Sequence, residues 1–518
     1  MWTPTRTASS WFRGRLPRRR PARRRRKRTD RTRVDIRRPY DPLSYLEANA
    51  SERPDDPAVF DLGRVVSFSE LAASVKALVR VLRAGDLGAG EPVGVRLPNI
   101  WEYVALELAI PAAGGVIMPL SPALGEAELG WAMERSGARW MITEADLPAL
   151  LSGRPPQPQP QAATSQTRYQ GPAPAPSRHL RIVEIALTSG TTGLPKLASL
   201  SAKLKQATFE GFTTRLQVTQ ADRVLVMSPL TQGIGGMCLF CLRLGAALIM
   251  LHDARPTPET LLRLAATHQA TMLVGVPTNV IRMLQSPDLK STDLSHARLT
   301  AVAGAPLPPA IAEAWERTTG SRVCSFYGSM DAGQLSVASP SDPQQKRWTS
   351  VGRPHATTEV KIEPDGEIAM RGDTVQTRYW DDPDGKGPQD AEGWAHLGDL
   401  GHLDADGFLY VTGRKKDLII RGGANINPTE VEDAIRRHPD VKDVAVVGKP
   451  DPELGERAVA FLVAGPPRPI TLDQLKAHLQ TQGLARYKWP EEVRHLEELP
   501  TKGPGKLDRQ SLRDRLLT

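Results

Sequence analysis

The sequence has little cysteine and no long apolar run, and each absence excludes a class of protein. Three cysteines in 518 residues cannot form the disulfide framework of a secreted scaffold, so we expect a reducing, cytoplasmic environment. No uninterrupted apolar stretch reaches the roughly 18 residues that a membrane span needs. The best candidate, Val104 to Leu120, is interrupted by Glu107, Pro111 and a glycine pair. The sequence therefore predicts a soluble globular protein, and its 40% hydrophobic content is ample for buried cores.

Cys238 and Cys241 form a CxxC pair, but no second pair of metal-ligand residues lies near them in the sequence. The surrounding stretch, GGMCLFCLRLGAALIML, is apolar. These surroundings favour packing of both thiols inside a buried helix over a zinc or redox site.

The formal net charge of +9 is concentrated at the start of the chain. Residues 1–38 contain 16 Lys and Arg against Asp30 and Asp35, a net charge of +14, so the remainder carries about −5. No apolar stretch follows the arginines, which excludes a secretory or twin-arginine signal, and serines are too few for an organelle address. We expect residues 1–38 to be a disordered, Arg-rich extension. An arm that binds nucleic acid or an anionic membrane is the alternative.

From Pro39 onward, helical periodicity alternates with short apolar runs, which is the pattern of an α/β protein. Val93 to Val95 predicts a short buried strand, and Tyr103 to Ala113 predicts the helix after it. We expect a large N-terminal domain of mixed, largely parallel sheets with flanking helices over residues 39–415, and a small, mobile α+β domain over residues 416–518. One predicted helical face consists of Leu71, Val75, Leu78, Val79 and Leu82.

Two segments break this pattern. Ser152 to Arg178 is rich in Pro, Gln and Ala and has too little apolar content to pack, so we expect a mobile surface insertion. The segment Gly413 to Gly423 (GRKKDLIIRGG) precedes a compact unit of about 100 residues, enough for a small domain. We therefore place a hinge there.

Ile182 to Leu187 predicts a strand that ends in a loop rich in glycine and threonine. Glycines let backbone N–H groups approach a phosphate, hydroxyls donate to its oxygens, and a lysine adds positive charge. The spacing differs from the Walker pattern GxxxxGK[ST]. The whole string favours a phosphate loop over a simple turn. Its members are Thr188, Ser189, Gly190, Thr191, Thr192, Gly193 and Lys196.

The string LTSGTTGLPK, residues 187–196, resembles the signature of the adenylate-forming (AMP-binding) superfamily of acyl-CoA synthetases, adenylation domains and luciferases. Six motifs in one order are far more specific than any one of them. The resemblance covers about residues 40–510 and implies activation of a carboxylic acid by ATP to an acyl-adenylate, then transfer to a thiol, in the first instance coenzyme A. The five further motifs are Gly304-Ala305-Pro306, YGSMD (327–331), WAHLGDL (394–400), GRKKD (413–417) and GPGKLDR (503–509).

The resemblance assigns roles in nucleotide binding. The loop 188–196, with Thr192 as a catalytic donor, would contact the ATP phosphates. Asp331 would hold Mg²⁺, a hard cation suited to oxygen ligands. Asp399 would accept the two ribose hydroxyls. Arg414 would contact the ribose from the other side, and Tyr327 would stack on the adenine. The remaining residues assigned to this site are Gly304, Ala305, Pro306 and Gly328.

The resemblance also assigns roles near the end of the chain. Lys506 would bridge the attacking carboxylate and the α-phosphate, because one ammonium between two anions lowers their repulsion and a flexible stem can reach from a mobile domain. Lys416 would be the hinge residue. Gly422 and Gly423 would line the thiol's approach, where missing side chains let a pantetheine arm pass the backbone.

Several positions depart from the family pattern. They bear on rate, metal geometry and substrate rather than on the fold. Asp331 replaces the usual Glu, Met330 and Leu397 each replace a Thr, and Leu197 stands where a Gly is usual. Gln232 stands where relatives often carry a His or an aromatic residue.

The acid pocket should come from residues 231–237, 276–280, 304–305 and 328–333. Apart from Asp331 these segments carry no charge, and Pro229 to Gly236 has no Asp to hold a substrate amine. We therefore expect an uncharged aryl, alicyclic or medium-chain aliphatic acid. The candidate lining residues are Gln232, Gly236, Val276, Ser329 and Gly333.

Three functions remain open at this point. The first is an acid:CoA ligase that uses ATP, Mg²⁺ and coenzyme A. The second is a stand-alone adenylation enzyme that loads the phosphopantetheine of a carrier protein, which would share every motif. The third is a catalytically silent protein that uses its arginine arm to bind nucleic acid.

Overall fold

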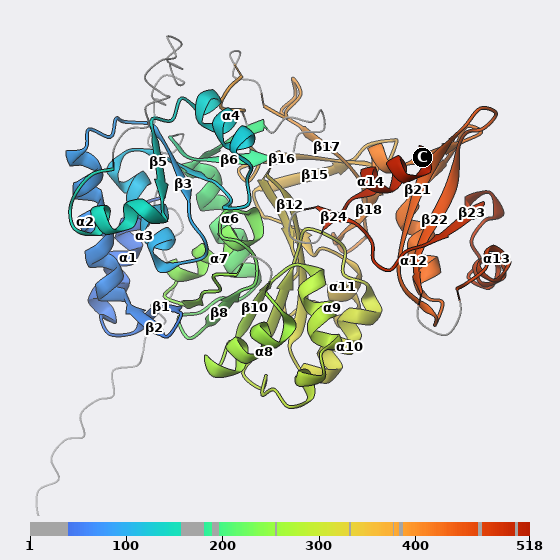
Figure 1. Ribbon diagram of the computed structural model, residues 1–518, viewed down its shortest axis with the longest axis horizontal. Coiled ribbons are helices and arrows are strands. Elements are labelled where there is room, and N and C mark those ends of the chain that lie inside the picture. The colour runs from blue at the N-terminus through green and yellow to red at the C-terminus, as the bar shows by residue number, and fades with distance from the viewer. Residues whose placement is uncertain are drawn as a thin grey trace, which may run out of the picture. The chain divides into compact units, whose positions relative to one another are not determined.

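The computed structural model describes residues 40–156, 181–188, 196–253, 256–330, 333–376, 378–382, 387–464, 469–502 and 506–517. The extension 1–38 and most of the Pro-rich insertion lie outside the described residues. Figure 1 shows the described elements in chain order, from blue through green and yellow to red. None of the described helices is long and apolar enough to cross a bilayer.

A five-stranded sheet is built around the candidate phosphate loop. Its strand order is β5-β3-β4-β6-β7, and every pair is parallel except β6 with β7. The predicted strand at residues 93–95 is the centre of β3, and the predicted strand at residues 182–187 is β6. The bounds are β3 Pro92–Arg96, β4 Val116–Pro119, β5 Trp140–Thr143, β6 Ile182–Thr188 and β7 Lys196–Ser201.

A nine-stranded sheet lies in the same N-terminal part of the chain, with the order β14-β13-β12-β11-β10-β8-β9-β1-β2. Its interior pairs, from β12 to β1, are parallel, and antiparallel strands extend both edges. The predicted α/β class with largely parallel sheets is therefore confirmed. The bounds are β1 Pro57–Asp61, β2 Arg64–Ser67, β8 Arg223–Val226, β9 Ala247–Ile249, β10 Met272–Gly275, β11 Leu299–Val302, β12 Arg322–Ser329, β13 Gly333–Val337 and β14 Arg353–Pro354.

Helices flank these sheets, and α2 shows why they form. The Ser67 hydroxyl accepts the Glu70 N–H while the Glu70 carboxylate accepts the Ser67 N–H, a capping box that satisfies the first turn. All five residues of the predicted helical face are buried, and each such side chain contributes about 1.5–3 kcal/mol. The bounds are α1 Pro42–Glu52, α2 Phe68–Ala84, α3 Trp101–Ala113, α4 Glu126–Ser136, α5 Leu147–Leu151, α6 Ala202–Arg215, α7 Gly233–Arg243, α8 Pro258–Thr267, α9 Pro277–Gln285, α10 Pro309–Thr319 and α11 Gln344–Thr349, with short 3-10 turns η1 Glu144–Asp146 and η3 Pro287–Lys290.

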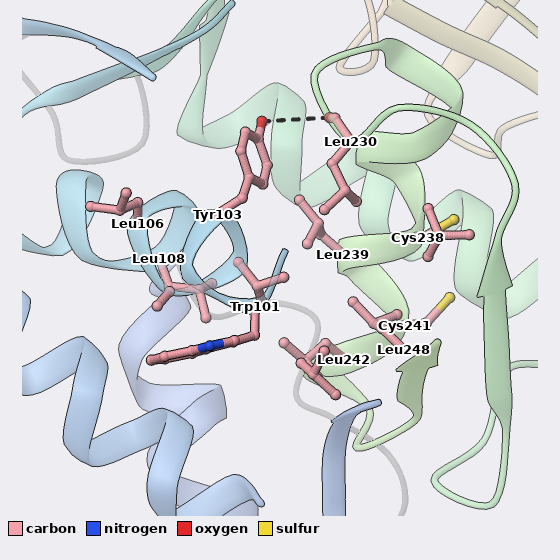
Figure 2. Close-up of a cluster of buried hydrophobic side chains, with 14 of the residues drawn as sticks. Trp101, Tyr103, Leu106, Leu108, Leu230, Cys238, Leu239, Cys241, Leu242 and Leu248 are labelled. Carbon is pink, nitrogen blue, oxygen red and sulfur yellow. Dashed lines mark hydrogen bonds between the residues drawn. The ribbon is translucent and has the colours of Figure 1, made fainter. Parts of the chain in front are cut away.

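The two cysteines of the CxxC pair lie in an apolar core between α3 and α7. Figure 2 shows Trp101 and Tyr103 among the buried side chains of this cluster, with the Tyr103 hydroxyl donating to the Leu230 carbonyl at 3.5 Å. Cys238 and Cys241 are fully buried and form no disulfide, and burial raises the pKa of both thiols. Both thiols therefore serve as core packing, as their apolar surroundings predict.

A buried ion cluster joins α3, β6 and α6. The Lys205 ammonium pairs with Glu184 and lies 3.3 Å from Glu107. All three side chains are buried, and one Glu107 oxygen has no hydrogen-bond partner among the described residues. Burial, with a further contribution from Glu184, raises the pKa of Glu107 to about 7, against the effect of Lys205. The cluster therefore holds a carboxyl group that can titrate near neutral pH.

The rest of the chain forms smaller, mainly antiparallel units. A four-stranded antiparallel sheet has the order β15-β16-β17-β18, and the last unit has the order β20-β19-β22-β21, with β23 parallel to β22. The helix α12, which begins at Pro428, has Asn427 as its N-cap. The bounds are β15 Thr358–Ile362, β16 Glu367–Gly372, β17 Ala395–Leu403, β18 Leu409–Arg414, η4 Lys415–Asp417, β19 Ile419–Arg421, β20 Ala424–Ile426, α12 Pro428–Arg436, β21 Val441–Asp451, β22 Gly455–Ala464, α13 Leu472–Thr481, η5 Arg486–Lys488, β23 Glu492–His495, β24 Thr501–Lys502, β25 Lys506–Leu507 and α14 Arg509–Leu517.

Candidate active site

The structure brings Tyr327, Asp399 and Arg414 into direct contact. Asp399 and Arg414 are register partners on β17 and β18, and Arg414 Nε lies 2.9 Å from Asp399 Oδ1. The Tyr327 hydroxyl, at the end of β12, donates to Asp399 Oδ2 at 2.5 Å. Burial and the neighbouring Asp399 carboxylate raise the pKa of Tyr327, so this hydroxyl remains a neutral donor. Three residues singled out from three separate motifs thus form one hydrogen-bonded group.

The carboxylate of Asp399 is held in a fixed orientation while keeping acceptor capacity. Asp399 is 4% exposed, and each of its oxygens has one protein partner. An ionised carboxylate offers about four lone-pair sites, so further donors can still bind. A cis-diol presents two hydroxyl donors at a matching spacing, which is the chemistry expected of a ribose-binding acid.

Glu367 supports the segment of β17 that presents Asp399, and the sequence motifs did not identify this residue. Its Oε1 accepts the Gly398 N–H at 2.8 Å, where Gly398 has a φ of +71°. Its Oε2 lies 3.0 Å from the Lys415 ammonium, which also pairs with Asp365 at 2.6 Å. The hydrogen bonds that Lys415 donates to Asp365 and Glu367 raise the pKa of Lys415. The only sequence signal was a PDGE turn, which carries no indication of such partners.

The candidate phosphate loop joins the two antiparallel strands β6 and β7. Thr188 and Lys196 are register partners at its base, and Thr188 is buried. The Lys196 ammonium lies 3.4 Å from the Tyr379 hydroxyl and 4.7 Å from the centre of that ring. The predicted phosphate ligands Ser189, Gly190, Thr191, Thr192 and Gly193 lie outside the described residues. The structure thus places this segment between two paired antiparallel strands, and its role in binding phosphate stays a prediction.

Leu197, which departs from the family pattern, packs in a core. It is fully buried in a cluster that includes Ile185 and Trp380. Its carbonyl accepts the Trp380 N–H at 2.7 Å, and an isolated bridge pairs Ala198 with Tyr379. A leucine here therefore fills volume beside the loop.

The candidate acid-pocket segments converge on the N-terminal end of α7, where Gln232 is the N-cap. A Cβ on Gly304, which has a φ of +87°, would lie 3.0 Å from Ile234 Cδ1 and 3.7 Å from Val276 Cγ1. A Cβ on Gly233 would lie 2.7 Å from Met330 Sδ. The structure thus joins three of the four predicted pocket segments to the fourth, residues 231–237.

The remaining pocket and nucleotide residues are placed as follows. Gly236 donates its N–H to the Gln232 carbonyl within the first turn of α7. Gly333 has a φ of +93°, and a Cβ there would lie 1.8 Å from the Thr374 carbonyl oxygen, so only glycine fits. Ser329 is half-buried. Asp331, the predicted Mg²⁺ ligand, lies outside the described residues. The exposed residues of this set are Ala305, Pro306 and Gly328.

The predicted hinge residue, the two glycines assigned to the thiol's path and the lysine assigned to adenylation all lie in the C-terminal part of the chain. Lys416 is exposed in the 3-10 turn η4. Gly422 and Gly423 have φ values of +55° and +82°, which suit glycine, and the Gly422 N–H donates to the Leu454 carbonyl at 2.7 Å. Lys506 lies on β25, with its backbone paired to β24. Its side chain lies outside the described part of the chain.

A metal centre made only of protein ligands is not found among the residues that the structure describes. None of them belongs to a group of three or more His, Cys, Asp or Glu side chains that could hold an ion. A Mg²⁺ ion usually takes one or two carboxylates together with water and phosphate oxygens.

Comparison with family models gives two matches in the order found in the chain. The model described as AMP-binding enzyme matches residues 46–380. The model described as AMP-binding enzyme C-terminal domain matches residues 430–506. Together they include the β6–β7 loop, the Tyr327 segment and Lys506.

Curated relatives and solved structures match this chain over nearly its full length. A sulfoacetate–CoA ligase of Cupriavidus necator is 32% identical over 91% of this chain and 97% of its own. A feruloyl-CoA synthase of an Amycolatopsis species is also 32% identical, over 91% of this chain and 98% of its own. The crystal structure of ATP-bound MatB from Rhodopseudomonas palustris superposes with a TM-score of 0.79 at 27% identity, covering 92% of this chain and 99% of that one.

Proposed function

Because this chain belongs to the AMP-binding enzyme family, we propose that it activates an uncharged carboxylic acid with ATP and transfers the acyl group to coenzyme A. It is an AMP-forming acid–thiol ligase. The observation that carries the proposal is the placement of Asp399, buried and held between the Tyr327 hydroxyl and the Arg414 guanidinium.

In the first half-reaction, an oxygen of the substrate carboxylate attacks the α-phosphorus of ATP. The bond from that phosphorus to the bridging oxygen breaks, and pyrophosphate leaves with the electron pair. Asp399 would hold the ribose hydroxyls, and the loop at residues 188–196 would donate to the phosphates. Lys506 would lie between the two reacting anions, lowering their repulsion where the bond forms.

In the second half-reaction, the sulfur of coenzyme A attacks the acyl carbon after the thiol loses its proton. The acyl–phosphate bond breaks, and AMP leaves. We place the conformational change between the two half-reactions at a hinge on Lys416, which separates residues 39–415 from residues 416–518. Gly422 and Gly423 would lie beside the thiol's path.

Mg²⁺ is proposed as the counter-ion of the ATP phosphates, where it would offset their negative charge, and Asp331 would supply a protein carboxylate. The reaction is proposed to occur in the cytoplasm, a placement that the three free, buried thiols support.

The class of acid rests on the side chains at the N-terminal end of α7. The described residues that meet there, Gln232, Ile234, Val276 and Met330, carry no charge. An aryl, alicyclic or medium-chain aliphatic acid fits such a lining better than a dianion would, because burying a second charge without a partner is costly. The relatives are named for both kinds of acid, sulfoacetate and feruloyl among them, so the substrate panel has to include both.

The test is an acid panel with ATP and Mg²⁺, in which hydroxylamine traps the acyl-adenylate. Aryl and aliphatic acids should give hydroxamate, while sulfoacetate and amino acids should give little. The best acid is then offered with coenzyme A and, separately, with a holo-carrier protein. Thioester on the carrier alone would replace the coenzyme A step. A lack of acid-dependent pyrophosphate exchange, together with DNA binding that is lost when residues 1–38 are deleted, would overturn the enzyme assignment.

A further inference from the structure

The segment that carries Lys506 is attached to the last helix of the chain. β24 and β25 form a two-stranded antiparallel hairpin in which Lys502 and Lys506 are register partners. The Asp508 N–H donates to the Pro500 carbonyl at 2.8 Å. The Asp508 carboxylate accepts the N–H and hydroxyl of Ser511, at 3.2 Å and 2.8 Å. The hairpin therefore leads directly into α14, and its base is closed by Asp508.

Arg509, the first residue of α14, anchors this junction to the domain core. Its two terminal nitrogens lie 2.6 Å and 2.9 Å from the two oxygens of Glu432, a fork-to-fork pair. Arg509 also donates to the Val446 carbonyl at 2.7 Å, while Glu432 accepts the Val446 N–H at 2.7 Å. Glu432 is 2% exposed. One guanidinium thus ties the hairpin to α12 and β21 at once.

The same guanidinium lies beside the predicted hinge. Arg509 Nε is 3.7 Å from Asp417 Oδ2, and a terminal nitrogen of Arg513 is 3.7 Å from the other oxygen of Asp417. Asp417 directly follows Lys416 in η4. On the other side of Lys416, Lys415 pairs with Asp365 and Glu367. The charged residues on either side of Lys416 therefore have different partners. Lys415 pairs with Asp365 and Glu367, just before and at the start of β16, whereas Asp417 faces Arg509 and Arg513 on α14.

We propose that Arg509 is a positioning residue that fixes the Lys506 hairpin and the start of the hinge in one rigid unit, so that Lys506 reaches the reacting groups only with Arg509 in place. The proposal rests on the proposed function, because it concerns a residue acting through Lys506. Arginine is required for its planar fork, which a lysine cannot reproduce on Glu432 and Val446 together. A misplacement of about 1 Å in a reacting group can cost about a hundredfold in rate.

The test compares R509K with R457K, a matched control. Arg457, on β22, also pairs with two carboxylates in the same unit, Asp451 and Glu491, and neither of these partners belongs to the hairpin or to α14. R509K should lower acid-dependent pyrophosphate exchange about tenfold or more, while transfer from preformed acyl-adenylate to coenzyme A changes less than about threefold. R457K should leave both half-reactions within about threefold of the parent.

Amide hydrogen exchange supplies a readout that does not depend on activity. Exchange at the amides of residues 501, 502, 506 and 507 should rise in R509K and stay unchanged in R457K. If R509K does not fold, the double variant R509Q/E432Q removes both charges without leaving either one buried alone, and the same two readouts decide. Unchanged adenylation in R509K, or equal loss in both half-reactions, would overturn the proposal. If the parent enzyme shows no acid-dependent pyrophosphate exchange, the proposed function is wrong instead. The hydrogen-exchange comparison would then still test whether Arg509 anchors the hairpin.

Discussion

Asp399 and Arg414 face each other on neighbouring strands, with Arg414 Nε 2.9 Å from Asp399 Oδ1. The Asp399 side chain is 6% exposed and that of Arg414 is 40% exposed, so the pair joins a buried anion to a cation that reaches solvent. The Tyr327 hydroxyl donates to the other carboxylate oxygen, Asp399 Oδ2. The carboxylate is therefore oriented before a nucleotide binds, which lowers the entropy cost of binding.

The first prediction is that D399N raises the KM for ATP about tenfold or more with little change in the KM for the acid, because asparagine keeps the size but loses one acceptor oxygen and the negative charge that pairs with Arg414. Pyrophosphate exchange at varied ATP concentration measures the effect. D404N is the matched control: Asp404, in the connection between β17 and β18, also accepts from a tyrosine, Tyr410, and from a cation, Lys346. An unchanged KM for ATP in folded D399N would contradict the ribose role.

The second prediction concerns Leu197. L197A should lower the free energy of unfolding by about 2–5 kcal/mol, because a fully buried leucine is removed from a packed cluster. L397A, at another off-pattern and only half-buried position, should cost about 1 kcal/mol. Urea unfolding measures both. Equal, small effects would show that Leu197 does not pack as described.

Much of the fold could be predicted from local pattern. The face from Leu71 to Leu82 follows helical period and is buried in α2, and the run from residue 182 is β6. Helix α3 begins at Trp101, two residues before the predicted start, because Ile100 is extended and serves as its N-cap. Such boundaries depend on local backbone geometry that periodicity does not encode.

The partners within the site could not be predicted in the same way. The motifs identified Tyr327, Asp399 and Arg414 separately, but the bond from Tyr327 to Asp399 spans 72 residues and two sheets. The role of Glu432 for Arg509 likewise depends on how α12 and α14 pack. A hydrogen bond formed only by tertiary packing leaves no spacing signature in one sequence.

The third prediction concerns pH. In the folded protein the pKa of Glu107 is raised to about 7 from an ordinary 4.5, mainly by burial, so between these values the folded chain keeps a proton that the unfolded chain has released. This contribution to stability is therefore full below pH 4.5 and is lost as pH rises toward 7. The free energy of unfolding of the parent, relative to E107Q, should fall by on the order of 2–3 kcal/mol across that window. Urea unfolding at pH 5, 6 and 7 measures it, and a parallel profile for both proteins would show that Glu107 does not titrate there.

The last prediction separates the two half-reactions at Lys506. K506A should lower acid-dependent pyrophosphate exchange about a hundredfold or more, because no ammonium then offsets the repulsion between the attacking carboxylate and the α-phosphate. Transfer from preformed acyl-adenylate should change only a few fold, since the carboxylate's charge has by then been used in the new bond. K502A is the control, since Lys502 is the register partner of Lys506 in the same hairpin and should leave both rates unchanged. Equal losses in the two half-reactions of K506A would place Lys506 outside the adenylation step, because a residue that acts only before pyrophosphate leaves cannot slow the attack of the thiol.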